Sequence, residues 1–159
     1  MSGLLWSTDR PEFVERVAAL AGGTTYRLPV AGRGTKTDQL PDAHAIAAAL
    51  AYARTEPDDI GPDVAYCWVL QSDAYRQQTT RRLAILLRSP RTRTLATHRL
   101  LAADVAWEVM IHNRRTKVAQ PADVMPRDWD ALLLAAIGML QAAAWEALDT
   151  AERCYRKRA

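Results

Sequence analysis

Three residues on one predicted helix have side chains that could hold a metal ion. Asp104, Glu108 and His112 follow one another at intervals of four residues, which places them on one face of an α-helix. A carboxylate and an imidazole one turn apart can share a metal ion, but three ligands on one straight helix rarely converge on it. We therefore interpret this polar strip as a solvated face supported by i,i+4 pairs, and we predict no metal and no other cofactor.

A second segment has the composition of a phosphate-binding loop. Residues 32–37 read Gly32-Arg33-Gly34-Thr35-Lys36-Thr37. In the P-loop of nucleotide-binding proteins Lys directly follows the last Gly of the motif, whereas here Thr35 stands between them. We therefore predict a plain loop, with a basic loop that touches a partner as the alternative.

The chain lacks the spacing patterns of common catalytic sites. Neither G-x-S-x-G nor H-E-x-x-H occurs, and Cys67 and Cys154 have no partner at C-x-x-C spacing. The remaining histidines, His44 and His98, have no ligand-type neighbour at helical spacing. We therefore predict that the protein is not an enzyme.

The most informative feature is a run of arginines, which we call the Arg block. Residues 74–103 contain seven arginines and no acidic residue, although the whole chain has 18 Asp and Glu and a net charge of only +3. Arg makes forked contacts to phosphate and carboxylate groups, and the turn within the block also carries Ser89, Thr92 and Thr94, residue types that commonly contact phosphates. The predicted binding residues are Arg76, Arg81, Arg82, Arg88, Arg91, Arg93, Thr94, His98 and Arg99, and a secondary basic cluster follows at Arg114, Arg115 and Lys117.

The centre of the Arg block resembles the helix-turn-helix of DNA-binding proteins. Residues 82–87 would be the supporting helix, Arg88-Ser89-Pro90-Arg91 the turn, and residues 92–100 the recognition helix. The resemblance covers residues 82–100 only. The turn lacks its usual Gly, and the apolar stretch 100–111 makes the second helix longer than a typical recognition helix. The resemblance implies that Arg91, Arg93, Thr94 and His98 face a groove or a phosphate backbone.

These features favour a small basic regulator that binds nucleic acid, most readily the backbone of a duplex. Phage transcription regulators and antiterminators offer an analogy of size and charge. The alternative is a non-enzymatic interaction module or inhibitor whose arginines dock an acidic protein surface, because the electrostatics of the two cases are identical. A third interpretation is a homo-oligomer built on the Ala-rich helix 128–155.

The elements that must position these residues are predicted to be helices. We expect a first helix capped by Thr8 or Asp9, with Pro11 in its first turn, that stops at Gly22, and further helices at 43–54, 61–70, 73–88, 90–113 and 126–155. Residues 24–30 form the only strand-like run, and Pro29 limits it to an edge strand or hairpin. The fold class is therefore all-α, a bundle of about six helices.

Length and composition fit one cytoplasmic domain. The 159 residues include 49% hydrophobic and 25% charged residues, which are the values of a globular domain, so we predict a single domain over residues 1–159. The first residues do not have the pattern of a signal peptide. The most apolar run, 131–145, is shorter than the ~20 residues of a membrane span, and we predict that it is a buried helix.

Overall fold

The computed structural model describes residues 3–22, 41–88, 94–114 and 120–158, and these form helices and connections without a strand. The predicted all-α bundle of about six helices is confirmed. The strand-like run 24–30 and the glycine-rich segment 32–37 lie outside the described residues. The helices are α1 (Gly3–Gly22), α2 (Ala43–Ala51), α3 (Gly61–Leu70), α4 (Arg76–Leu86), α5 (Ala96–Ile111) and α6 (Pro126–Arg158).

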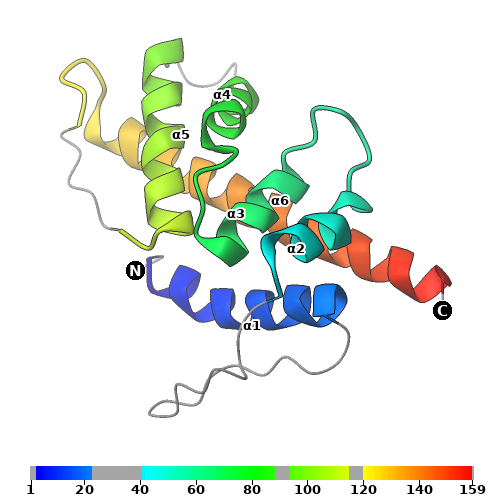
Figure 1. Ribbon diagram of the computed structural model, residues 1–159. Helices are drawn as coiled ribbons and strands as arrows, with labels where there is room; N and C mark the ends of the chain where they lie inside the picture. Colours follow the sequence, from blue (N-terminus) through cyan, green and yellow to red (C-terminus); the bar gives the residue numbers. More distant parts are fainter. Residues whose placement is uncertain (1–2, 23–40, 89–93, 115–119, 159) are drawn as a thin grey trace.

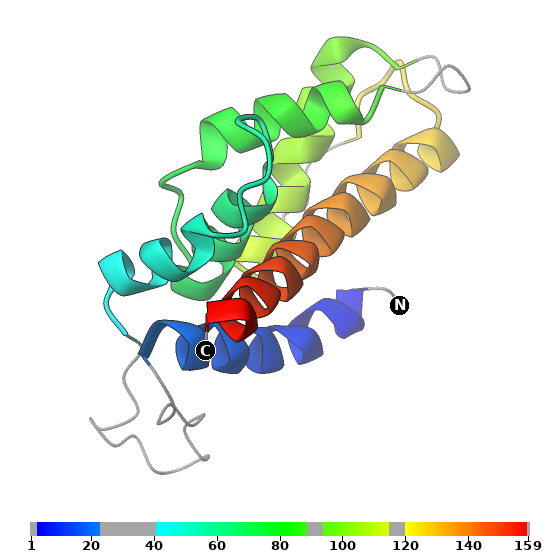
Figure 2. The same ribbon diagram turned by 90° about the vertical axis from the view of Figure 1, so that its right-hand side faces the viewer.

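The longest helix, α6, organises the other five. It packs most extensively against α3 and α5 and also contacts α1, α2 and α4. Figure 1 shows α6 crossing the molecule from the connection after α5 to the C-terminus, and Figure 2 shows α1 crossing beneath its second half. Within the described part of the chain, α6 is also the one helix long and apolar enough to cross a membrane, a test that the core helix of a soluble protein passes as well.

Local sequence signals set several helix boundaries as predicted. The Asp42 side chain accepts a hydrogen bond from the Ala45 backbone N–H at 2.7 Å and caps α2. The helix α3 begins at Gly61-Pro62, where Pro fits the first turn because its missing N–H would have no helical partner. The helix ends at Gln71, whose left-handed backbone (φ 50°) terminates it.

The predicted start of the first helix is wrong. The structure begins α1 at Gly3, so that Pro11 lies inside the helix. A proline in a helix interior removes one backbone hydrogen bond. The residues that follow it offset this loss through packing, because Phe13 and Val17 are fully buried.

The core is rich in aromatic side chains and close helix contacts. The ring centroid of Phe13 lies 4.5 Å from that of Trp68 and 5.1 Å from that of Trp145, which joins α1, α3 and α6. Gly61 allows α3 to approach α6 closely, because a Cβ at this position would lie 2.8 Å from the Ala143 carbonyl oxygen. The remaining core consists mainly of Ala, Leu, Val and Ile.

Candidate nucleic-acid interface

The Arg block lies on α4, on α5 and on the connection between them. The two helices pack against each other, and Figure 2 shows α5 passing behind α4. Nine residues separate Leu86, the last of α4, from Ala96, the first of α5. The predicted four-residue turn and the helix start at Pro90 or Thr92 are therefore wrong, because a helix-turn-helix joins its helices through only three or four residues.

The late start of α5 has a local cause. Leu95 is extended (φ −74°, ψ 154°) and no side chain caps the helix at this residue. The Arg99 guanidinium donates to the Thr94 carbonyl oxygen and lies 3.3 Å from the Thr94 hydroxyl, so it holds the backbone just before the helix. In addition, Thr94 belongs to a residue type that forms helices less readily than Ala, the type of the first residue of α5.

Arg76 is neutralised by acids from α5. Its guanidinium lies 2.9 Å from Asp104 and also pairs with Glu108, and both Arg76 and Glu108 are largely buried. These pairs surround the guanidinium with carboxylates. Arg76 therefore ties α4 to α5, and its charge is not available to an external ligand.

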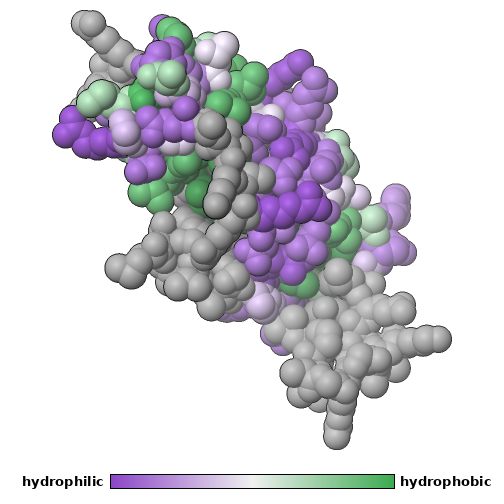
Figure 3. All heavy atoms as spheres, turned by 90° about the vertical axis from the view of Figure 1, so that its left-hand side faces the viewer, coloured by the Kyte–Doolittle hydropathy of each residue, from purple (hydrophilic) through white to green (hydrophobic). Residues whose placement is uncertain are grey.

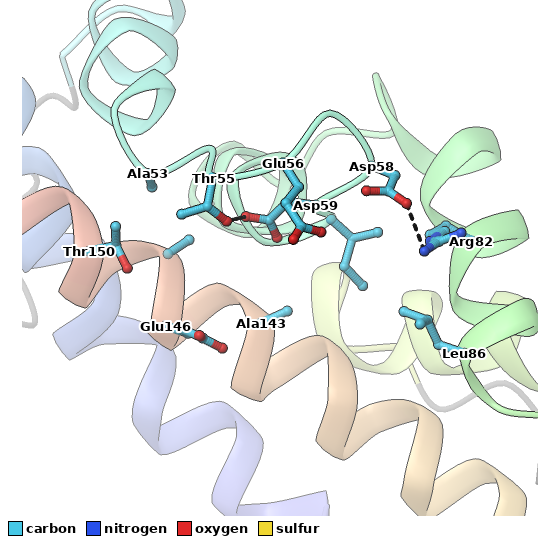
Figure 4. Close-up of a pocket in the computed structure, with 12 residues that line it drawn as sticks. Ala53, Thr55, Glu56, Asp58, Asp59, Arg82, Leu86, Ala143, Glu146 and Thr150 are labelled. Carbon is cyan, nitrogen blue, oxygen red and sulfur yellow. Dashed lines mark hydrogen bonds and ion pairs between the residues drawn. The ribbon is translucent and has the colours of Figure 1, made fainter.

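Arg82 is also paired within the chain. Its guanidinium lies 2.8 Å from Asp58 in the connection between α2 and α3. Figure 4 shows this pair at the edge of an acidic pocket of about 340 Å³, into which Glu56, Asp59 and Glu146 also point. The Arg block is free of acids in sequence, but the fold supplies acids to it from other segments.

His98 and Arg99 have structural contacts of their own. His98 is buried, and its Nε2 lies 3.0 Å from Asp123 Oδ1 in the connection before α6. Arg99 is half-buried against Thr94. The structure therefore separates these two predicted site residues from the exposed arginines, and we leave them out of the candidate interface.

Two arginines of the block stay exposed, Arg81 on α4 and Arg88 just after the end of this helix. Neither has an ion pair or hydrogen bond among the described residues. Arg81 lies in the second half of α4, and Arg88 lies two residues beyond Leu86, the last residue of this helix. Ile85, between them in sequence, is 62% exposed. We call Arg81, Ile85 and Arg88 the Arg81 face.

A groove of about 710 Å³ runs beside the Arg81 face, between α4 and α5. It is lined from α4 by Arg76, Gln77, Thr80 and Arg81, from α5 by Thr97, Leu100, Leu101 and Asp104, and by Asp73 from the connection before α4. Leu95 and Leu100 are exposed apolar side chains at the start of α5. Figure 3 shows hydrophobic side chains interspersed with hydrophilic ones at the upper end of the molecule, where Figure 1 places the start of α5. The surroundings of Arg81 are thus partly apolar.

The polar strip of α5 pairs with neighbouring segments instead of with itself. Asp104 and Glu108 bind Arg76, and His112 Nε2 lies 2.7 Å from Asp73 Oδ1. The predicted i,i+4 pairs within the strip are replaced by these longer-range contacts. No group of three His, Cys, Asp or Glu residues in the described ranges is arranged to hold a metal ion.

Asp73 is the centre of a second polar contact between segments. Its Oδ1 accepts hydrogen bonds from His112 and from Trp107 Nε1, the latter at 2.8 Å. These hydrogen bonds, with His112 contributing most, hold the pKa of the Asp73 carboxyl below its usual value. They favour the charged form of the carboxyl.

The rest of the predicted basic residues are divided between described and undescribed segments. Arg114 is exposed and lies 3.7 Å from Glu108. Arg91, Arg93, Arg115 and Lys117 lie outside the described residues.

Sequence reasoning missed the acidic partners and the apolar neighbours of the arginines. The contacts of Asp58, Asp73 and Asp123 with distant Arg and His side chains have no signal in local spacing, because 24 to 39 residues separate the partners. The exposure of Ile85 could have been predicted from the sequence, because the helical period of α4 places this apolar residue on the solvent side of the helix.

Comparison with protein-family models, with curated proteins and with solved structures finds no match for this chain. Its function is therefore inferred from the geometry and electrostatics of its own residues.

Proposed function

We propose that this protein binds nucleic acid through the Arg81 face and the connection that follows it. The observation that carries the proposal is the exposure of Arg81 and Arg88 without an acidic partner among the described residues. Their neighbours Arg76 and Arg82 are paired with acids. The face therefore carries two arginines that have no ion pair among the described residues, and the segment that follows in sequence adds Arg91 and Arg93.

Contacts to phosphate are the form of binding that this surface supports. One guanidinium group belongs to α4 and the other to the residue that lies two positions after its end, so both are exposed at the C-terminal end of this helix. Such exposed, forked donors suit the phosphates of a nucleic-acid backbone. If Arg81, Arg88, Arg91 and Arg93 each neutralise one phosphate, the logarithm of the binding constant falls against the logarithm of salt concentration with a slope of about −3.6.

A second candidate is an acidic protein surface, and a specific observation favours it. Ile85, Leu95 and Leu100 are exposed next to the arginines. Arg combined with exposed aliphatic side chains is typical of the centre of a protein interface. Aliphatic side chains contribute little to binding a phosphate backbone, so their substitution distinguishes a nucleic-acid partner from a protein partner.

The test measures fluorescence anisotropy of a labelled duplex and of a labelled single-stranded RNA over a range of salt concentrations. We expect the wild-type protein to bind with a steep salt dependence and the double reversal Arg81→Glu/Arg88→Glu to abolish binding. The single variant Arg82→Gln should retain most of it, because Arg82 already pairs with Asp58.

A matched control separates a specific surface from general charge attraction. Arg156→Glu/Lys157→Glu changes the net charge by the same amount at exposed positions near the end of α6, and it should bind like the wild type. Equal weakening by both double variants, or no salt-sensitive binding by the wild type at micromolar concentration, would contradict the proposal. If Ile85→Ser/Leu100→Ser leaves nucleic-acid binding intact but abolishes capture of a protein that the wild type captures, the second candidate is favoured.

A further inference from the structure

Two cavities adjoin each other along the connection between α2 and α3. The first is the acidic pocket of about 340 Å³ described above, which extends to Glu146 on α6. The second has a volume of about 310 Å³ and extends to Thr79 on α4. We call the two cavities together the acidic trough, because both are lined by the same four residues, Asp58, Asp59, Ile60 and Arg82.

The acidic trough carries more negative than positive charge. Among the described residues that line it, Arg82 is the one cation, and it pairs with Asp58. Arg54 reaches the trough by pairing with Asp63 at 2.7 Å. Five carboxylates against two arginines leave an excess of three negative charges, and a cavity lined by charges of one sign concentrates counter-ions. The five carboxylates belong to Glu56, Asp58, Asp59, Asp63 and Glu146.

Three of these carboxylates have no cationic partner among the described residues. Glu56 and Glu146 make neither an ion pair nor a hydrogen bond there. The Asp59 carboxylate accepts hydrogen bonds from neutral groups, the Gly61 N–H at 2.9 Å and the Thr55 hydroxyl. Figure 4 shows Glu56 and Asp59 on the connection after α2 and Glu146 on α6. The uncompensated carboxylates thus come from two separate elements and border one cavity.

A buried hydroxyl in the second cavity lacks a hydrogen-bond partner. Thr79 is only 1% exposed and lines this cavity, but its Oγ1 has no partner among the described residues. An unpaired polar atom in a protein interior is unfavourable and uncommon. Because a hydroxyl oxygen accepts hydrogen bonds, Thr79 offers an acceptor to a ligand with N–H groups. This observation is independent of the acidic side chains and indicates the same kind of ligand.

The apolar part of the lining indicates an organic cation. Ala53, Ile60 and Ala147 are buried residues that line the first cavity, and the partly exposed Leu86 lines it as well. Methylene groups can pack on such side chains, whereas a hydrated metal ion cannot use them. No three carboxylates in the described ranges are arranged to hold a metal ion. The lining therefore suits a molecule that joins positive charges through aliphatic segments.

We propose that the acidic trough binds a linear aliphatic polyamine that spans both cavities. Its ammonium groups would pair with Glu56, Asp59 and Glu146 and donate to Thr79, and its methylene groups would pack on Ile60 and the neighbouring alanines. An ammonium group has three N–H donors on a compact charge, whereas a guanidinium requires donors and acceptors in one plane. Carboxylates that come from two elements suit the ammonium group. This binding goes beyond the proposed function and uses none of the residues of the Arg81 face.

The first experiment is isothermal titration calorimetry of the nucleic-acid-free protein with the triamine spermidine at constant ionic strength. We expect one spermidine per chain with a dissociation constant below about 100 μM. The variant Glu56→Gln/Glu146→Gln should raise this constant at least about tenfold, because two uncompensated carboxylates are lost. The matched control Glu12→Gln/Glu15→Gln makes the same charge change at two exposed positions of α1 and should bind like the wild type. Equal weakening by both double variants would contradict a specific site.

Thr79→Val tests the second cavity. Valine replaces the hydroxyl by a methyl group of similar size, and the hydroxyl has no partner in the described part of the chain. The melting temperature should therefore not fall, while the dissociation constant of spermidine should rise about tenfold through loss of a hydrogen bond to a charged group. Unchanged affinity in the folded variant would contradict a ligand that spans both cavities.

Other occupants of the acidic trough give different results. Absence of saturable spermidine binding by the wild type up to about 1 mM would overturn the proposal. Displacement of spermidine by Mg²⁺ at equal ionic strength would also overturn it, because the trough would then attract any counter-ion. A tetralysine peptide that binds more tightly than spermidine would assign the trough to a basic protein segment instead. Because Arg81 and Arg88 are unchanged in every variant, these results are separate from the test of nucleic-acid binding.

Discussion

Arg76 on α4 and Asp104 on α5 form an ion pair of 2.9 Å between residues 28 positions apart in the chain. Glu108, one turn further along α5, binds the same guanidinium. An arginine that sequence alone places in a free basic block is thus the link between two helices. Its substitution should change the stability of the fold more than the binding of a ligand.

Arg76→Ala is expected to lower the free energy of unfolding by about 2–4 kcal/mol, because it leaves the largely buried Glu108 without its main partner. Urea denaturation followed by circular dichroism measures this loss. Arg81→Ala is the control, and as an exposed substitution without a described partner it should change the free energy by less than about 0.5 kcal/mol. Equal effects of the two variants would show that the network around Arg76 contributes little.

Asp73 should make the stability depend on pH in the acidic range. Its pKa is lowered in the folded protein, chiefly by the hydrogen bond from His112. The resulting stabilisation is present above the pKa of the unfolded chain and is lost as the pH falls through the lower, folded value. We expect Asp73→Asn to be less stable than the wild type near neutral pH, with the difference shrinking as the pH falls below about 4. A difference that stays constant with pH would contradict this assignment.

The two cysteines should differ sharply in reactivity. Burial raises the pKa of the Cys67 thiol to about 12, whereas Cys154 is partly exposed and both thiols are free. Because the thiolate is the reactive form, a thiol reagent at pH 8 should modify one cysteine in the folded protein and two in denaturant. The variant Cys154→Ser should show no rapid reaction until it unfolds. Rapid labelling of native Cys154→Ser would contradict the burial of Cys67.

Gly61→Ala should destabilise the fold through the contact between α3 and α6. The added methyl group would lie 2.8 Å from the Ala143 carbonyl oxygen and 3.2 Å from the Ala147 side chain, and a backbone oxygen cannot move without shifting α6. Overpacking of this kind costs about 1–3 kcal/mol, although alanine is the better helix former. A thermal melt measures the effect, and a midpoint equal to or above that of the wild type would show that the two helices separate readily.

Much of the architecture could be predicted because its signals are local. Helix starts are indicated by Asp42 before an alanine-rich run, by Pro62 in α3 and by Pro126 in α6. Such residues indicate a helix start whatever the rest of the chain does. The start of α1 could not be predicted in this way. Pro11 indicates a helix start locally, and burial of Phe13 and Val17 in the folded core decides otherwise.

The sequence by itself determined that this protein is helical and that thirty consecutive residues carry seven arginines and no acid. Only the tertiary structure decided which of these arginines keep a free charge. Coulombic attraction depends on distance in space and not on separation along the chain, so Asp58 and Asp104 neutralise Arg82 and Arg76 from remote segments. Arg81, next to Arg82 in sequence, projects in another direction because successive residues of a helix turn by 100°, and it has no ion pair among the described residues.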